Sequence, residues 1–257
     1  MSLLDFILCM VGYGCSLVML GRFFPHAPGL VRLNWQGRKV ATAGGVVVPL
    51  ALTLSAPLMI AGQRWDGMSQ GCLLIAYGYS LWGLLDDCAG FPARGLGGHL
   101  WQVLRGRVSS GVLKAAGGLL VAWAALVTAG RPWPWYAPGA VALTANAFNQ
   151  VDKRPGWAAT MATLAVVAAG PLGAPSYVLL GTLAAYLPAD LGCRVMLGDA
   201  GANCLGALVG LLVSYRLDPG ALVTYILIVG VFNAVADCVS LSLLVERAKG
   251  AWRGFRG

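Results

Sequence analysis

Charged residues are scarce in this sequence, and their scarcity excludes an ordinary soluble fold. Only 11% of the 257 residues are charged, 58% are hydrophobic, and the mean hydropathy is +0.73. A soluble domain carries about 25% charged residues, so this chain has too little polar surface to cover a globule in water. Lipid must cover the rest, and we expect one membrane domain over residues 1–257 with no separate soluble domain.

Histidine and closely spaced cysteine are also scarce. The two histidines, His26 and His99, lie far apart, and the seven cysteines include no Cys-x-x-Cys pair. These absences exclude a histidine-rich metal cluster and the common zinc motifs, and we interpret the cysteines as small core residues with free thiols. The segment Met1–Met10 lacks the basic start of a cleaved signal peptide, so we expect a retained first helix.

Apolar runs of helical length are abundant instead. A transmembrane helix needs about 20 mostly apolar residues, and small residues within such runs suit close packing of helices in lipid. The sequence therefore predicts an all-α polytopic transmembrane protein with about nine spans. These spans are 3–24, 41–61, 68–85, 111–129, 136–151, 157–172, 175–191, 200–215 and 220–245.

The net charge of +8 comes from basic residues in short loops between the apolar runs, which argues against nucleic-acid binding. If the nine spans alternate in direction, one side of the membrane has only three of the 18 Lys and Arg residues, namely Arg64, Arg131 and Arg216. The positive-inside rule places the other, basic side in the cytoplasm, with the N-terminus outside and the C-terminus inside. We expect residues 247–257 to form a basic cytoplasmic tail.

Acidic residues concentrate on the same predicted cytoplasmic side, first in Gly83–Asp87. Two adjacent carboxylates, Asp86 and Asp87, are costly at a membrane boundary unless a cation or bases relieve their repulsion. Consecutive helical residues point about 100° apart, so the two aspartates would serve different partners. The alternative interpretation is a solvated helix end without function.

Two further motifs lie at predicted cytoplasmic helix ends. In the first, Asn146, Asn149 and Lys153 share a helix face, Asp152 follows three residues after Asn149, and Pro155-Gly156 ends the helix. In the second, Asp199 lies between glycines at a helix start, where it could hold a metal while backbone N–H groups meet a phosphate. Without function, these motifs would be an ordinary helix terminus and an ordinary aspartate N-cap.

The three motifs together predict one site on the cytoplasmic face. Mg²⁺ prefers oxygen ligands, usually one or two carboxylates together with substrate phosphates. Phosphoryl transfer is mainly positioning plus charge neutralisation by metal ions and basic side chains. Basic side chains on the same side are available for that role, namely Arg38, Lys39, Lys114, Lys153, Arg154 and Arg194.

The order of these motifs resembles that of the polyprenyl-phosphate N-acetylhexosamine-1-phosphate transferase family (glycosyltransferase family 4), which includes the phospho-N-acetylmuramoyl-pentapeptide transferases. A fourth element, Ala41–Gly45, looks like the family's Pro-Thr-x-Gly-Gly stretch, and the resemblance covers residues 35–210. It implies transfer of a sugar-1-phosphate from a UDP-sugar to a membrane polyprenyl phosphate, with release of UMP. Such a step would initiate cell-envelope glycan synthesis at the inner (plasma) membrane, require Mg²⁺ or Mn²⁺, and be carried out by a possible homodimer.

The resemblance also implies roles for individual residues. Asp199 matches the family's metal-binding aspartate, and the pair Asp86-Asp87 matches a catalytic pair with a base or phosphate-orienting role. Asp152 is expected near both metal and nucleotide. The expected substrate-binding residues are Lys39, Lys114, Asn146, Asn149, Asp152 and Arg154.

Some features depart from the family and leave alternatives open. The family's histidine-rich loop after the ninth span has no counterpart in Glu246–Arg256, so the sugar donor is undetermined, and His99 has no assigned role. A transporter or flippase for a charged or lipid-linked solute remains an alternative, although only Asp237 is an acid deep within a predicted span. A prenyltransferase would need paired Asp-x-x-Asp motifs, which neither Asp86-Asp87 nor Asp199 provides, and a catalytically inactive scaffold also stays open.

Overall fold

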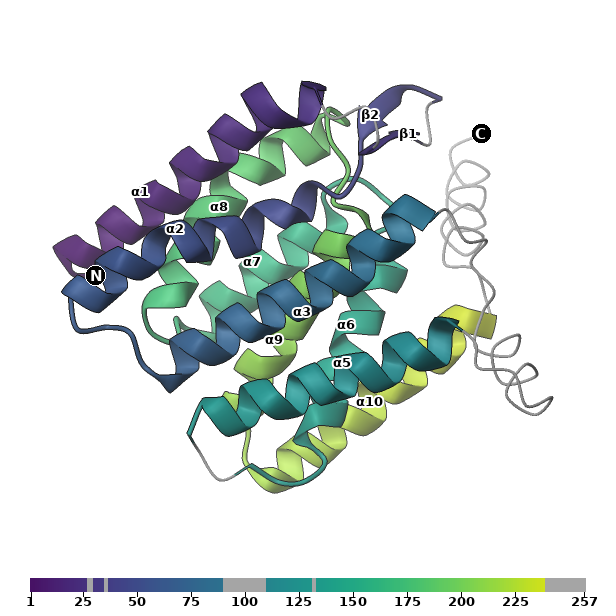
Figure 1. The fold of residues 1–257 in the computed structure, drawn as a ribbon. Coiled ribbons are helices and arrows are strands. Elements are labelled where there is room, and N and C mark those ends of the chain that lie inside the picture. The colour runs from purple at the N-terminus through teal and green to yellow at the C-terminus, as the bar shows by residue number, and fades with distance from the viewer. Residues whose placement is uncertain (27–29, 35–36, 90–109, 131–132, 239–257) are drawn as a thin grey trace, which may run out of the picture.

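A computed structural model describes residues 1–26, 30–34, 37–89, 110–130 and 133–238 of the chain (Figure 1). Nine α-helices make up most of that part, which confirms the predicted all-α class, and each overlaps a predicted span. They are α1 (Leu3–Val18), α2 (Val47–Ala61), α3 (Gly67–Ala89), α5 (Ser110–Thr128), α6 (Ala137–Val151), α7 (Trp157–Ala169), α8 (Ala174–Leu191), α9 (Gly198–Arg216) and α10 (Pro219–Cys238).

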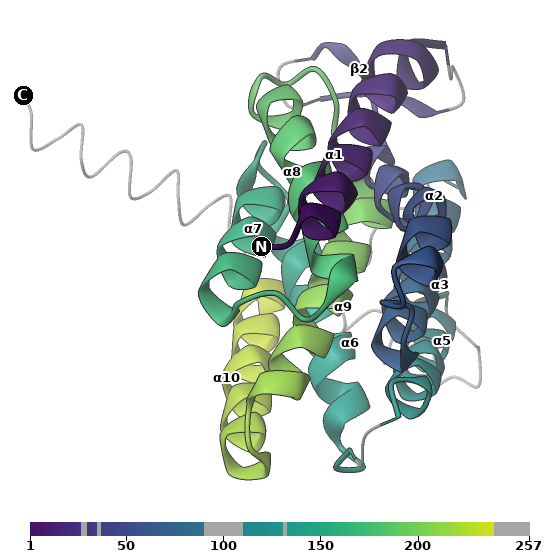
Figure 2. The ribbon, with the colours of Figure 1, turned by 90° about the vertical axis from the view of Figure 1, so that its left-hand side faces the viewer.

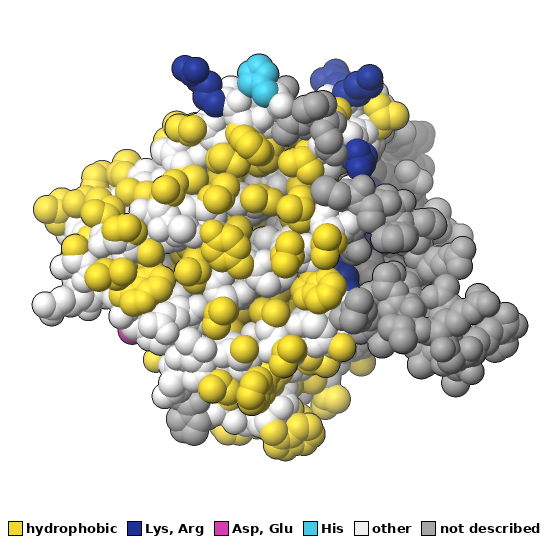
Figure 3. Space-filling view, viewed as in Figure 1, with side chains coloured by type: hydrophobic (Ala, Val, Ile, Leu, Met, Phe, Trp, Pro, Cys, Tyr) yellow, Lys and Arg dark blue, Asp and Glu magenta, His cyan; other side chains and the backbone are white. Residues whose placement is uncertain are grey.

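Three helical stretches in the described part are long and apolar enough to cross a membrane: Leu3–Phe23, Gly44–Ala61 and Pro219–Ala236. Large apolar side chains on the outer faces of α1 and α10 are exposed, for example Leu17 and Ile228, and apolar side chains cover most of the face in Figure 3. Soluble proteins rarely expose so wide an apolar surface to water, whereas a surface in contact with lipid is apolar. The fold therefore supports a membrane location, and the count of nine spans stays a prediction.

Helix α9 forms the centre of the bundle (Figures 1 and 2). Every residue from Ala200 to Leu212 is buried, because the neighbouring helices α3 and α6 approach it closely. An added Cβ at Gly206 would lie 2.7 Å from the Cα of Ala145, and one at Gly210 would lie 2.7 Å from the Cα of Val141. Small residues thus give α9 its contacts, as expected for helices that pack without a hydrophobic drive between them.

The segment before α2 differs from the prediction, which had a helix from residue 41. Strand β1 (Val31–Leu33) pairs antiparallel with β2 (Lys39–Ala41), and a 3₁₀ turn over Gly44–Val46 leads into α2. Ala43 has a left-handed backbone with φ +59°, and Ala41 forms a parallel bridge to Val195. The helix therefore begins only at Val47, because the preceding backbone bonds to a distant part of the chain.

The first predicted span is one continuous helical stretch whose geometry changes near its end. Helix α1 has regular α geometry from Leu3 to Val18 and continues as a π-helical turn over Met19–Phe23. The face of α1 that packs on α8 contains Gly12, whose added Cβ would lie 2.9 Å from the hydroxyl of Thr182. Figures 1 and 2 both show α1 alongside α8.

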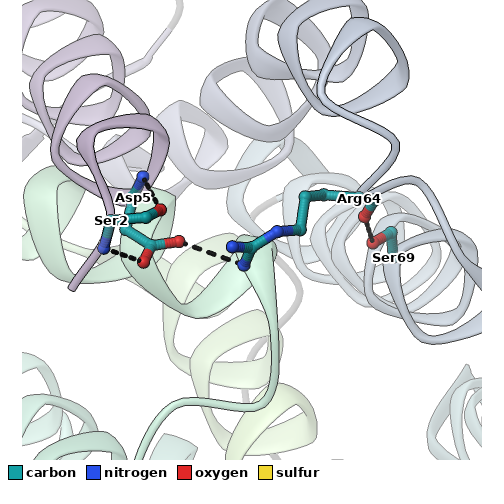
Figure 4. A network of polar contacts seen from close by, with 4 residues as sticks. All are labelled: Ser2, Asp5, Arg64 and Ser69. Atoms are coloured by element: carbon teal, nitrogen blue, oxygen red, sulfur yellow. Dashed lines mark hydrogen bonds and ion pairs between the residues drawn. The ribbon is translucent and has the colours of Figure 1, made fainter.

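A small polar network fixes the start of α1 to the turn between α2 and α3 (Figure 4). Ser2 and Asp5 form a reciprocal capping box, and the Arg64 guanidinium lies 3.3 Å from the Asp5 carboxylate. Asp5 is only 4% exposed, so its charge needs this partner. The network lies at the helix ends opposite those that carry Asp87, Asp152 and Asp199.

Candidate functional site

Asp87, near the end of α3, contacts the first turn of α9. Its two carboxylate oxygens accept hydrogen bonds from the backbone N–H groups of Asp199, at 3.2 Å, and Ala200, at 3.1 Å. The N-terminal residue of α9 has no side-chain cap of its own. A carboxylate at a helix N-terminus satisfies unpaired N–H groups and interacts favourably with the helix dipole. Asp87 on α3 therefore caps α9. The alternative interpretation of the sequence, in which Asp199 is the N-cap, had assigned this role to Asp199.

The carboxylate of Asp199 turns instead toward α5. Its Oδ2 lies 3.4 Å from Nζ of Lys114, and the two side chains are 37% and 25% exposed. Asn203, one turn further along α9, donates its side-chain N–H to the backbone oxygen of Asp199 at 2.6 Å. The Asp199 carboxylate and the Lys114 ammonium group both stay partly exposed to solvent in this pair, so a ligand can reach them.

The Ala41–Gly45 stretch lies directly against the start of α9. The N–H groups of Gly44 and Gly45 donate to the carbonyl oxygens of Met196, at 3.0 Å, and Leu197, at 3.1 Å. Gly198 has φ +70°, and an added Cβ there would lie 2.6 Å from the Ala43 nitrogen and 2.7 Å from Oδ2 of Asp87. Only glycine fits at this junction, because both the backbone conformation and the lack of space exclude a side chain.

Asp152 ends α6 at the same end of the bundle. Burial raises the pKa of Asp152 well above its ordinary value, and the negative charges of Asp190, Asp199 and Asp87 raise it further. The charges of three acidic side chains from α3, α8 and α9 thus act on Asp152 at the end of α6. The excess of negative charge is the electrostatic environment in which a cation is stabilised.

Asp190 is a residue whose role the sequence did not indicate. It is 2% exposed, and its carboxylate accepts a hydrogen bond at 3.2 Å from the N–H of Gly156. Gly156 has φ +77° and immediately precedes α7, so this bond holds the turn that carries Asp152 and Arg154 against α8. The only sequence signal was an acid near the predicted cytoplasmic end of a span.

The donor atoms permit a metal site of limited size. Within the described residues, no group of three or more His, Cys, Asp or Glu side chains is close enough to hold a metal ion, so Asp87, Asp152 and Asp199 do not form a three-carboxylate metal site. Asp87 already accepts two N–H bonds, and the side chain of Asp86 lies outside what the structure describes. Asp199 and Asp152 fit a Mg²⁺ ion held by one or two carboxylates plus phosphates.

The amides of α6 contribute differently from one another. Asn146 donates to the side-chain oxygen of Asn233 on α10 at 2.7 Å, and Asn233 donates to the backbone oxygen of Leu143 at 3.0 Å. Asn146 therefore joins α6 to α10, and its predicted contact with substrate is untested. Asn149 is half-buried one turn closer to Asp152.

An apolar cavity of about 460 Å³ lies beside this turn, between α6, α7 and α10. Among the described lining residues, Lys153 and Arg154 are the charged ones, and the Arg154 guanidinium lies 5.9 Å from the centre of the Trp157 ring. The described apolar and aromatic lining includes Ala147, Phe148, Val151, Trp157, Met161, Tyr225, Ile228, Val229 and Phe232. Such a cavity can accept a hydrocarbon chain whose head carries negative charge.

Lys39 and Lys114 lie in different surroundings, and the predicted substrate contact of Lys39 stays a prediction. Lys39 lines a second cavity with Arg194, between α1, α8 and the β1–β2 hairpin, whereas Lys114 is the cation paired with Asp199. His99 and the predicted tail over residues 247–257 lie outside the described residues, as does the side chain of Asp237. Their predicted roles are therefore untested.

Comparison with known proteins gives a limited match. No family model matches the chain. A phospho-N-acetylmuramoyl-pentapeptide-transferase from Moorella thermoacetica is 30% identical over 194 residues, which cover 66% of this chain. The chain spans 59% of the length of this curated relative. This similarity supports a distant family relationship between the chain and that transferase.

Proposed function

We propose that this chain is a membrane enzyme that transfers a sugar-1-phosphate from a UDP-sugar to a polyprenyl phosphate. In this reaction a phosphate oxygen of the acceptor attacks the β-phosphorus of the donor. The bond between that phosphorus and the oxygen bridging to the α-phosphate breaks, UMP leaves, and a lipid-linked diphosphate sugar forms. The name of the Moorella relative agrees with this general kind of reaction.

The observation that carries the proposal is the junction of four separate segments at the start of α9. Ala41–Gly45, Asp87, Lys114 and Asp199 meet there through backbone hydrogen bonds and an ion pair. Three of them, Ala41–Gly45, Asp87 and Asp199, belong to motifs in which the sequence resembles the transferase family, and Lys114 is an expected substrate-binding residue. A shared position for motifs spread over more than a hundred residues is expected of a catalytic site and is not needed for packing alone.

The side chains suit a reaction between two anionic phosphates. Lys114 is close enough to Asp199 to hold it in place and exposed enough to contact a donor phosphate, which lowers the repulsion between the reactants. Lys153 and Arg154 lie at the apolar cavity, where they fit the acceptor phosphate while the polyprenyl chain occupies the cavity. A divalent cation held by Asp199, with Asp152 as a second oxygen donor, would supply charge neutralisation for the donor diphosphate.

The same arrangement favours a cytoplasmic site. The acids and Lys114 lie at the helix ends that the positive-inside rule assigns to the cytoplasm, and Arg64 and Arg216 lie at the opposite ends. UDP-sugars are made in the cytoplasm, so a donor site on that side needs no transport step. The homodimer remains a prediction of the resemblance, which leaves the identity of the sugar undetermined.

A reconstituted assay tests the proposal. The purified protein in nanodiscs would receive polyprenyl phosphate, Mg²⁺ and a panel of UDP-sugars, with UMP release and the mass of the lipid product measured. We expect Asp199→Asn to reduce turnover at least 100-fold, the order of magnitude lost with one key electrostatic group. Asp218→Asn, an exposed acid at the opposite end, is the matched control and should retain activity.

Equal turnover by wild type and Asp199→Asn would contradict the proposal, provided that both proteins elute as folded species. The transporter alternative predicts a different result, namely flux of a charged or lipid-linked solute across proteoliposomes without any release of nucleotide. Measuring both quantities on one preparation separates the two functions.

A further inference from the structure

The second cavity, between α1, α8 and the β1–β2 hairpin, is not used by the proposed reaction. It measures about 560 Å³ and combines an apolar wall with two basic side chains. The wall comes from α1 and the turn that follows it, including Tyr13, Leu17 and Leu20, and from the alanines of α8. A cavity with these two kinds of lining suits an amphiphilic molecule.

The apolar wall opens toward the surface that lipid covers. Leu17 is 49% exposed and Tyr13 is 38% exposed, and they belong to the same apolar outer face of α1 as Phe6 and Met10. Phe24, which also lines the cavity, is only 3% exposed. The cavity therefore continues an apolar helix surface inward, so a hydrocarbon chain lying along α1 could enter it without crossing water.

The basic side chains are Lys39 on β2 and Arg194 just after α8. Both are exposed, and neither forms a hydrogen bond or ion pair through its side chain with another residue in the part of the chain that the structure describes. No acidic residue is among the lining residues. Among the described residues, the cavity thus presents two positive charges without an acidic partner.

We infer that this cavity binds an anionic phospholipid, with its phosphate between Lys39 and Arg194 and an acyl chain against α1 and α8. The occupant is identified by charge complementarity at one end and by continuity with the lipid-facing surface at the other. Helix ends with basic residues on the cytoplasmic side attract anionic lipids in this way. The inference does not depend on the proposed transferase activity, because lipid binding is measured without nucleotide or acceptor.

The test counts bound lipid directly. The protein would be reconstituted in phosphatidylcholine nanodiscs with a small fraction of phosphatidylglycerol, extracted mildly, and the retained lipids measured by mass spectrometry. We expect phosphatidylglycerol to be enriched over phosphatidylcholine and Arg194→Gln to reduce that enrichment about fivefold, the effect of removing one basic residue near a lipid phosphate. Arg22→Gln is the matched control, since Arg22 is exposed on the adjacent turn but does not line the cavity.

A second variant tests the apolar part independently of charge. Leu17→Trp places a larger side chain in the mouth of the cavity, and its partial exposure allows the substitution without disturbing the core. We expect this variant to lose phosphatidylglycerol enrichment while both cations remain. Each variant would first be checked for unchanged helix content and elution volume.

The inference is overturned if Arg194→Gln and Arg22→Gln retain the same amount of phosphatidylglycerol, which would indicate a general surface effect. It is also overturned if millimolar inorganic phosphate or a UDP-sugar displaces the lipid, because the cations would then serve a soluble phosphate. Failure of the transferase assay with normal phosphatidylglycerol enrichment would contradict the proposed function alone.

Discussion

A single added methyl group at Gly201 tests the close contact that assembles the site. Gly201 lies in the first turns of α9, and a Cβ there would lie 2.6 Å from the Cα of Gly45. That separation is too short for two non-bonded carbon atoms, and the opposing atom is backbone, which cannot rotate away. Gly201→Ala must therefore push α9 away from the segment before α2 and weaken the bonds from Gly44 and Gly45 to Met196 and Leu197.

The expected cost follows from the kind of contact that is disturbed. Overpacking a tight contact costs about 1–3 kcal/mol, and 1 kcal/mol corresponds to about 2–4 °C in melting temperature for a protein of this size. We therefore expect Gly201→Ala to melt about 2–12 °C below wild type in the same detergent or nanodisc. If the proposed function is correct, turnover should fall as well, because Asp199 lies two residues away.

The control is Gly230→Ala on α10. Gly230 is also helical, but an added Cβ there meets nothing within 4 Å. Alanine favours a helix over glycine by up to about 1 kcal/mol, so this variant should melt at or slightly above the wild-type temperature. Identical melting of Gly201→Ala and Gly230→Ala would refute the argument from close packing.

Three further substitutions test charges at the same end of the bundle. Asp87→Ala removes the carboxylate that caps α9 and should cost about 0.5–2 kcal/mol in thermal unfolding; unchanged stability would contradict the capping role. Lys114→Gln removes a partly exposed ion pair with Asp199 and should change stability by less than about 1 kcal/mol, while turnover in the UDP-sugar assay falls at least tenfold if the proposed phosphate contact exists. Lys114→Arg keeps the positive charge and is the control. If Lys114→Gln and Lys114→Arg turn over equally fast, Lys114 does not make the proposed phosphate contact. The pKa of Asp152 is raised in the folded protein, so its ionised form opposes folding above its ordinary pKa, and Asp152→Asn should raise the melting temperature at pH 8. A lower melting temperature would show that the Asp152 carboxylate is stabilised by partners.

The sequence predicted the helices well because their signal is local. Runs such as 136–151 and 175–191 are apolar over the full length of a helix, and the structure places α6 and α8 within one residue of those bounds. The glycines that set how closely α9 packs, such as Gly206, were recognisable as small residues, but their partners on α6 were not. Composition predicts that helices pack closely, whereas the choice of neighbour depends on contacts between distant segments.

The sequence also identified most segments of the site but not the way they bond. The β1–β2 hairpin escaped prediction because its strands have three residues each, and part of their pairing is to Val195, far along the chain. The sequence singled out both Asp87 and Asp199. It did not predict that Asp87 would cap α9, because this cap comes from another helix. Lys39 and Lys114 looked equivalent in the sequence, and only the fold places them in different surroundings.

Asp87 lies far along the chain from the two N–H groups that donate hydrogen bonds to it, and this separation has a consequence for biosynthesis. The two parts are separated by 112 residues, and ribosomes add about 5–20 residues per second. The third helix therefore waits on the order of 6–22 s for its partner, with an unneutralised aspartate pair at its end. During that interval the Asp87 carboxylate lacks the two N–H groups that bond to it in the folded chain, so this end of the bundle can assemble only after α9 has been made.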